Sequence, residues 1–485
     1  MNSVQKMAKN LGFSSIAQIV VYFLGFLFAI YLARTLGEAG YGQYSFVLAF
    51  TTLFTTFADI GMNQYLIREI ARDKSLYGSY VSNIFTIKVA LSFFTLGLIV
   101  LVINLMGYPE NVKNLVYIFG IYIILSSFIA TMSAIFQSFE RMDFSSLITI
   151  MEKIIIIVIG VLVLSIGYSL IELAYGYILA SIMGMAVGLF FLVKKIDRKM
   201  GKIDLSSWKK IIYPSLPFGL NGLFAVLYFQ IDSVLLSFLK NDVAVGVYNA
   251  AYNPILALGA ISTNIFMPVV YPMMSRYFTS SKDTLTKLTE LSTKYLLIIG
   301  LPSAIGCFVL AKEFITLFYG SEYANSIIAF QILAFFIPVR ILNSITGTLL
   351  SSINKQNLRM IGVLVGAFFN ILINLVLIPL FSYVGASIAT VLSELLLYLV
   401  FIYFINKYHS RINSGKYVIK PLVASIIMGI VLFYLNTFNL FTNILLLKIL
   451  ILVSIGSLIY FICLICLKTF TNEDKYIFKQ LLRRF

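Results

Sequence analysis

Basic side chains stand inside long apolar segments of this 485-residue chain. An ionisable group at the middle of a bilayer costs about 2.5–3.5 kcal/mol on insertion scales, so it needs a water-filled cavity or a partner of opposite charge. Lysine and arginine both bind phosphate, and the planar guanidinium donates two hydrogen bonds to it. We therefore predict that an anionic headgroup binds to Lys88, Arg340 and Lys153.

Carboxylic acids occur in the same kind of segment. Asp232 shares its segment with other polar side chains, and Glu394 lies in the middle of a later one. Burial favours the neutral form of a carboxyl group, so either residue is a candidate for proton or cation coupling. An alternative remains open, in which Asp232 or Glu394 forms a structural ion pair with Lys88 or Arg340.

Amide side chains recur in the apolar segments, twice at the i, i+4 spacing that places two residues on one face of a helix. They are predicted to line a polar cavity that suits sugar hydroxyls, with hydrogen bonding between helices as the alternative. The candidates are Asn221, Gln230, Asn249, Asn253, Asn370 and Asn374.

The elements that position these residues are predicted to be membrane-spanning helices. The chain is 60% hydrophobic and only 12% charged, with a mean hydropathy of +0.95. A bilayer core of roughly 30 Å needs about 20 apolar residues per helix. These values predict an all-α polytopic membrane protein with about fourteen spans. The predicted spans are 11–33, 41–62, 79–105, 112–138, 144–166, 171–193, 211–238, 243–272, 291–311, 325–352, 359–381, 383–406, 418–436 and 442–467.

Positive charge alternates along the chain. Most of the 36 Lys and Arg residues fall in every second gap between the predicted spans, and this bias marks cytoplasmic loops. Both termini are therefore predicted to be cytoplasmic, in a multi-pass protein of the cell membrane. The net charge of +16 is assigned to contact with anionic membrane lipids rather than with nucleic acid.

The chain also contains an internal sequence repeat. Gly42-x-Tyr44 and Gly246-x-Tyr248 are 204 positions apart, and Arg72 and Arg276 have the same separation. Six spans per repeat is an even number, so both repeats insert with the same orientation. We predict two pseudo-symmetric six-helix lobes at 1–200 and 201–410. Residues 411–485 are predicted to form two additional transmembrane helices and a basic cytoplasmic tail.

Signatures of catalysis are absent from the sequence. It has no P-loop, no H-E-x-x-H and no G-x-S-x-G. It holds one histidine, His409, and its three cysteines lie in apolar spans. We predict that the protein is not an enzyme, uses no cofactor or metal, and draws its energy from ion or substrate gradients.

The motif LG-x-x-GYG-x-Y, from Leu36 to Tyr44, is followed by DIGMNQYLIREIAR. Together they resemble the Wzx-type polysaccharide flippases of the multidrug/oligosaccharidyl-lipid/polysaccharide exporter superfamily. Glycine in this motif is predicted to form a tight external turn. The resemblance implies two six-helix lobes that move polyprenyl-pyrophosphate-linked oligosaccharide from the cytoplasmic to the outer leaflet by alternating access. Membrane lipids, a glycan polymerase and glycosyltransferases are further candidate partners.

Two other functions were weighed against this one. An ion-coupled multidrug exporter of the same superfamily would need a cavity dominated by carboxylates. Here four acids that lie further inside the spans are matched by four bases: Asp59, Glu152, Asp232 and Glu394 against Lys88, Lys153, Arg340 and Lys448. A membrane glycosyltransferase or polymerase would carry a sizeable external loop, and the predicted external loops are short. The identity of the glycan and the coupling ion stay open.

Overall fold

The computed structural model describes residues 3–196, 201–409, 415–438 and 444–470. Within these ranges the chain is helical and contains no strand, which confirms the predicted all-α class. A helix satisfies its own backbone donors and acceptors, as a chain in lipid requires. The helices are α1 (Ser3–Leu53), α2 (Thr55–Asp59), α3 (Met62–Arg72), α4 (Tyr77–Leu105), α5 (Glu110–Ser138), α6 (Met142–Ser165), α7 (Leu170–Lys195), α8 (Trp208–Leu239), α9 (Asp242–Ile261), α10 (Met267–Ser280), α11 (Lys282–Val309), α12 (Ala311–Tyr319), α13 (Ser326–Ala334), α14 (Phe336–Ser352), α15 (Gln356–Tyr408), α16 (Gly415–Thr437) and α17 (Leu445–Cys466).

Twelve helical stretches among the described residues are long and apolar enough to cross a membrane. Two of them, Ala17–Asp59 and Gln356–Tyr408, each run through two of the predicted spans. Each of these stretches contains a residue with positive φ, Gly37 at 66° and Ser382 at 51°. The chain is therefore a multi-pass membrane protein. The count of fourteen spans and the cytoplasmic termini stay predictions, and residues 1–2 and 471–485 lie outside the described ranges.

The chain divides into two compact units. Unit 1 comprises Met1–Asn249 and Ala367–Ser382, and unit 2 comprises Ala250–Gly366 and Tyr383–Phe485. Both α9 and α15 are shared between the units: α9 is divided once, and unit 1 takes the middle of α15 while unit 2 takes its two ends. The lobe boundaries predicted at 200 and 410 stay predictions.

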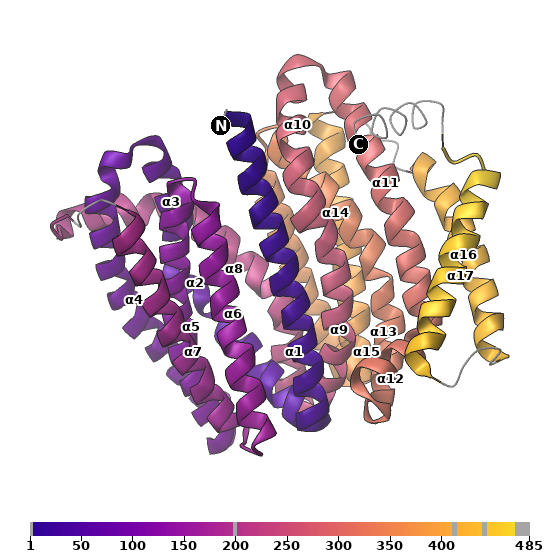
Figure 1. Ribbon diagram of the computed structural model, residues 1–485, viewed down its shortest axis with the longest axis horizontal. Coiled ribbons are helices and arrows are strands. Elements are labelled where there is room, and N and C mark those ends of the chain that lie inside the picture. Colours follow the sequence, from indigo (N-terminus) through magenta and orange to yellow (C-terminus); the bar gives the residue numbers. More distant parts are fainter. Residues whose placement is uncertain (1–2, 197–200, 410–414, 439–443, 471–485) are drawn as a thin grey trace. The chain divides into compact units, whose positions relative to one another are not determined.

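In unit 1 the helices α3, α4 and α5 enclose an apolar interior. Met62, Leu66 and Ile70 recur on α3 at helical spacing, and all three are fully buried. They pack with residues such as Val81 on α4 and Phe136 on α5. Since lipid is as apolar as leucine, this packing is driven by close contact between the helices rather than by escape from water. Figure 1 shows α1 running beside α6 in the same unit.

Two glycines of the repeated motif meet each other within unit 1. A Cβ atom on Gly42 would overlap the carbonyl oxygen of Asp242, and a Cβ atom on Gly246 would overlap the carbonyl oxygen of Glu38. Glu38 and Asp242 are themselves 204 positions apart, as are the two glycines. The contact is therefore reciprocal, like the contact across a two-fold axis.

The glycines of this motif have different structural roles. Gly37 has a φ of 66°, in the left-handed region that glycine tolerates best, and it makes the predicted turn. Gly42 lies within a helical stretch and serves instead to bring two backbones together. The predicted glycine turn is thus confirmed at Gly37, while Gly42 permits a close helix crossing.

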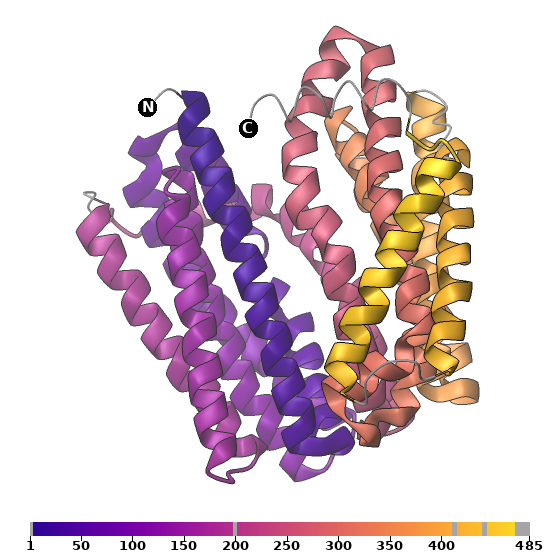
Figure 2. The ribbon, with the colours of Figure 1, turned by 45° about the vertical axis from the view of Figure 1, so that its right-hand side comes forward.

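Unit 2 is built around α11, which packs against α14 and α16. Figure 2 shows α17, in yellow, beside α16. The hydroxyl of Tyr460 on α17 donates a hydrogen bond of 2.8 Å to the carbonyl of Ile298 on α11. At the other end of α17, the Lys448 ammonium lies 3.6 Å from a Glu313 carboxylate oxygen on α12. These polar contacts fix α17 against the rest of the unit.

Candidate substrate site

Lys88, on α4, is fully buried among oxygen atoms of unit 1. Its ammonium nitrogen lies 2.8 Å from Oδ1 of Asp59. It donates hydrogen bonds of 2.9 Å to both the carbonyl and the hydroxyl of Ser127, and one of 2.6 Å to the Thr131 hydroxyl. A longer bond of 3.4 Å reaches Oδ1 of Asn63. The ammonium group is thus enclosed by acceptors.

The partner of Lys88 is set by a break in the helix. Ile60 and Gly61 have φ angles of 49° and 79°, so α2 ends at Asp59, whose carboxylate reaches α4. Lys88 has the geometry of a structural ion pair, with Asp59 in place of Asp232 or Glu394. Its role in headgroup binding stays a prediction.

Arg340 and Glu394 form the ion pair that the sequence offered as an alternative interpretation. In unit 2, Nη1 of Arg340 on α14 lies 3.4 Å from Oε1 of Glu394 on α15. The side-chain amide of Asn343 donates to the same carboxylate oxygen at 2.9 Å and to the backbone carbonyl of Glu394 at 2.8 Å. Glu394 is fully buried, whereas the Arg340 side chain keeps 20% of its surface exposed. Arg340 is therefore the accessible member of the pair.

Asp232 accepts hydrogen bonds from two neutral side chains of unit 1. The Tyr248 hydroxyl donates to Oδ2 at 2.8 Å, and the Asn374 amide donates to Oδ1 at 2.6 Å. The same amide also donates to Oδ1 of Asn370 at 3.1 Å. The structure thus joins three predicted residues on α8 and α15. The sequence analysis missed Tyr248 as a partner, although that tyrosine belongs to the repeated Gly-x-Tyr motif.

The remaining predicted amides do not join this group. Asn249 donates to the Ser233 hydroxyl at 3.0 Å and to the Val245 carbonyl at 2.9 Å, which is hydrogen bonding of the structural kind. Asn221 is exposed on α8, and Gln230 is half-buried on the same helix. Asn253 is half-buried on α9, in the part that belongs to unit 2. Their roles in lining a cavity stay predictions.

Lys153 differs from the other predicted cations. It is half-buried on α6, and within the described ranges its ammonium makes no hydrogen bond or ion pair. Its side chain lies against α1 at Gly25, where a Cβ atom would come within 3.3 Å of the lysine Cε. The neighbouring Glu152 accepts a hydrogen bond of 2.7 Å from Ser126 on α5. The lysine therefore keeps its hydrogen-bonding capacity for a ligand or for water.

No group of His, Cys, Asp and Glu side chains among the described residues could hold a metal ion. The polar groups inside the helices are lysine, arginine, carboxylate, amide and hydroxyl. Such groups can bind anions, cations and sugar hydroxyls.

The model of the polysaccharide biosynthesis protein family matches residues 7–278, more than half of the chain. The chain belongs to this family. Its match spans α1 to α10 and so includes Lys88, Lys153 and Asp232. The resemblance drawn from the glycine motif is confirmed.

Individual proteins that are similar to this chain are consistent with the family assignment. A probable flippase, AglR of Haloferax volcanii, is 24% identical over 392 residues, which cover 78% of this chain and 79% of that protein. The solved structure of a lipid II flippase, MurJ, in an inward closed conformation has a TM-score of 0.75 and 18% identity, and covers 93% of this chain and 97% of its own. An inward-facing multidrug resistance transporter of the MATE family has a TM-score of 0.65 and 15% identity, covering 80% and 95%. This chain therefore has the same fold as these membrane transport proteins.

Proposed function

We propose that this protein is a flippase. It moves polyprenyl-pyrophosphate-linked oligosaccharide from the cytoplasmic to the outer leaflet of the cell membrane, by alternating access and without hydrolysing ATP. Family membership supports the link to polysaccharide biosynthesis. The similarity to flippases, in sequence and in fold, supports movement of a lipid-linked substrate across the membrane, and the direction is part of the proposal. The protein acts on membrane lipids, works beside glycosyltransferases and glycan polymerases, and is not an enzyme.

The observation that carries the proposal is the state of Lys153. Lys153 is half-buried in an apolar helix and forms no ion pair among the described residues, although the neighbouring Glu152 attracts it. A lysine in such a position needs water or an anion to compensate the rest of its charge. The pyrophosphate of a lipid-linked sugar supplies that anion, and the half-buried position strengthens its attraction relative to bulk water. Arg340 in unit 2 has an exposed edge and is a second candidate for binding an anionic headgroup, and Lys88 is the third.

Carboxylates provide the coupling in this proposal. Asp232 accepts hydrogen bonds from the neutral side chains of Tyr248 and Asn374. Asp232 is buried among the helices of unit 1, which makes it the first candidate for proton or cation coupling. Glu394, which is paired with Arg340, couples if that pair opens during transport.

An ion-coupled multidrug exporter is the second candidate. It is favoured by one specific observation, the likeness to a multidrug transporter, and by the buried Asp232. A cationic drug would be attracted by carboxylates and repelled by Lys153. The two functions therefore predict opposite effects when the positive charge at 153 is removed.

The test uses cells that depend on the protein for surface glycan. Spheroplasts are treated with a probe that labels only outer-leaflet lipid-linked sugar. Wild-type protein and Lys153→Arg should restore labelling, whereas Lys153→Gln should lower it at least tenfold at equal protein level. Unchanged labelling in Lys153→Gln, together with increased efflux of a cationic dye, would replace the flippase with the exporter.

A further inference from the structure

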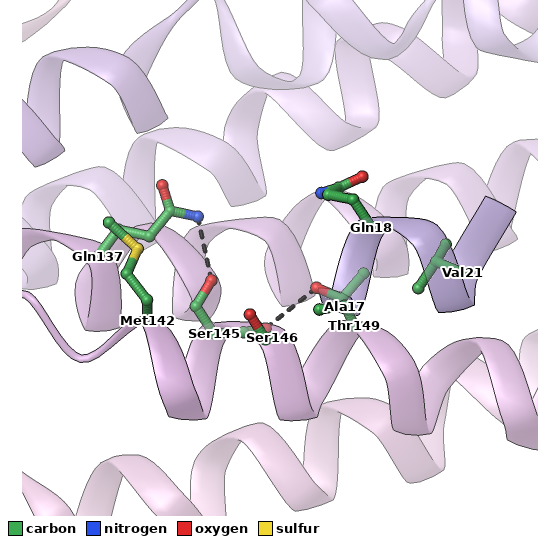
Figure 3. Close-up of a pocket in the computed structure, with 8 residues that line it drawn as sticks. All are labelled: Ala17, Gln18, Val21, Gln137, Met142, Ser145, Ser146 and Thr149. Carbon is green, nitrogen blue, oxygen red and sulfur yellow. Dashed lines mark hydrogen bonds between the residues drawn. The ribbon is translucent and has the colours of Figure 1, made fainter. Parts of the chain in front are cut away.

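A cavity of 270 Å³ opens in unit 1 between three helices. Its walls come from α1, from the last turn of α5 and from the first two turns of α6. Figure 3 shows Gln18 on α1 facing Gln137 and the start of α6 across this space. The gap between α5 and α6 carries Arg141, and the predicted topology places that gap at the cytoplasmic face.

The cavity is lined by hydrogen-bonding groups without charge. These are the amides of Gln18 and Gln137 and the hydroxyls of Ser145, Ser146 and Thr149. The remaining lining residues are apolar and give the ring face of a sugar a surface to pack on. Because none of the described lining side chains is charged, the cavity favours a neutral polar ligand over an ion or a cationic drug.

Part of this polar lining is fixed in place and part stays available. The Gln137 amide donates to the Ser145 hydroxyl at 3.1 Å, and the Thr149 hydroxyl donates to the Ser145 carbonyl at 3.1 Å. The side chains of Gln18 and Ser146 form no hydrogen bond with any described residue. Polar groups next to lipid need partners, so a ligand or water must supply them here.

Lys153 lies one helical turn beyond the cavity lining, on α6. Thr149 and Lys153 are separated by one helical turn on α6, as are Val21 and Gly25 on α1, and Lys153 packs against Gly25. A turn rises about 5.4 Å, close to the distance between neighbouring groups of a sugar phosphate. The neutral part therefore lies nearer the helix ends, and the cation lies one turn deeper.

We propose that this cavity is a sugar subsite that binds the saccharide unit adjacent to the phosphate, while Lys153 binds the phosphate itself. The proposal rests on the proposed function and adds the part of the substrate that is recognised. The cavity volume of 270 Å³ is below the roughly 300–1,000 Å³ of pockets for drug-sized ligands. A cavity of this size suits one or two sugar rings rather than a long glycan. The subsite would let the protein distinguish a glycosylated lipid from the bare carrier.

The test is binding of two lipids to the purified full-length protein. One probe is a polyprenyl pyrophosphate without sugar, and the other is the same lipid carrying one N-acetylhexosamine. Wild-type protein should bind the glycosylated lipid about tenfold more tightly, the effect of one or two additional hydrogen bonds. Gln18→Leu combined with Ser146→Ala should bind both lipids equally, at the affinity of the bare carrier. Lys153→Gln should weaken binding of both.

Gln64→Leu is the matched control, because Gln64 is an exposed amide on α3 outside the cavity. It should keep the tenfold preference. Gln137→Leu is the second test variant, and it too should abolish the preference. Equal binding of the two lipids by wild-type protein that still moves lipid-linked sugar would overturn the subsite alone. Failure of wild-type protein to bind or move either lipid would overturn the proposed function, and the subsite with it.

Discussion

Lys88 and Lys153 are two lysines of the same unit, both on long apolar helices, with opposite surroundings. Lys88 is fully enclosed and meets a carboxylate at 2.8 Å and several other oxygen acceptors. Lys153 is half-buried, has no such partner among the described residues and lies one turn from a polar cavity. The comparison suggests a rule for charged residues in membrane helices. A residue whose charge is compensated by other protein groups stabilises the structure, whereas a residue whose charge is not compensated in this way is available to bind a ligand.

The largest expected effect concerns the enclosed lysine. Lys88→Met leaves Asp59 without its cation and should lower the free energy of unfolding by about 3 kcal/mol, the low end for a broken buried pair because Asp59 keeps 21% exposure. Thermal unfolding of the purified protein measures this loss. The double variant Lys88→Met/Asp59→Asn should regain more than half of it. A single variant as stable as wild type would remove the structural role.

The glycine crossing tests whether tight packing in unit 1 is as sensitive as the buried ion pair. Gly42→Ala would overlap the Asp242 carbonyl and should cost about 1–3 kcal/mol. The control is Gly97→Ala, on a helix position where a Cβ atom meets nothing within 4 Å, and it should be neutral or stabilising. Equal melting temperatures for the two variants would contradict the close crossing.

Lys153 should show the reverse pattern, a loss of function without a loss of stability. Lys153→Gln should change the free energy of unfolding by less than about 1 kcal/mol, since it breaks no ion pair with a described residue. Outer-leaflet labelling of lipid-linked sugar should fall at least tenfold, and Lys153→Arg should restore it. If Lys153→Gln instead unfolded the protein, the contrast with Lys88 would disappear.

The smallest effect is expected for a lysine at a helix end. Lys113 forms an i, i+3 ion pair of 2.8 Å with Glu110, whose side chain is 78% exposed. Water screens such a pair, so Lys113→Gln should change stability by at most about 1 kcal/mol. Both thermal unfolding and outer-leaflet labelling should match wild type. A strong effect on labelling would show that removing any lysine, rather than one at a particular site, impairs transport.

The repeat shows which features could be predicted from the sequence and which could not. The spacing of 204 residues relates Gly42 to Gly246 and was visible in the sequence, but it did not show that these glycines touch. The structure adds that each glycine packs against the residue that precedes the other by four positions. A repeat in sequence predicts equivalent elements, whereas contact between them depends on how the helices cross.

The partners of the charged residues were the least predictable feature. Arg340 with Glu394 was among the alternatives considered, but Lys88 was not expected to meet Asp59, which the sequence analysis did not propose as its partner. The left-handed residues after Asp59 determine that meeting, and hydropathy does not report backbone angles. The cavity between α1, α5 and α6 was missed because its residues carry no charge. The hydroxyl spacing of Ser145, Ser146 and Thr149 was the only signal.

The sequence by itself was enough to predict that the chain lies in a lipid membrane, that it is all-helical, approximately where its spans lie and which family it belongs to. Each of these follows from local composition and short motifs. A run of about 20 apolar residues has one stable form in lipid, whatever the rest of the chain does. Only the tertiary structure decided which buried charges compensate each other and where a polar cavity remains. Those outcomes depend on distances between residues far apart in the chain, such as 88 and 59 or 18 and 137.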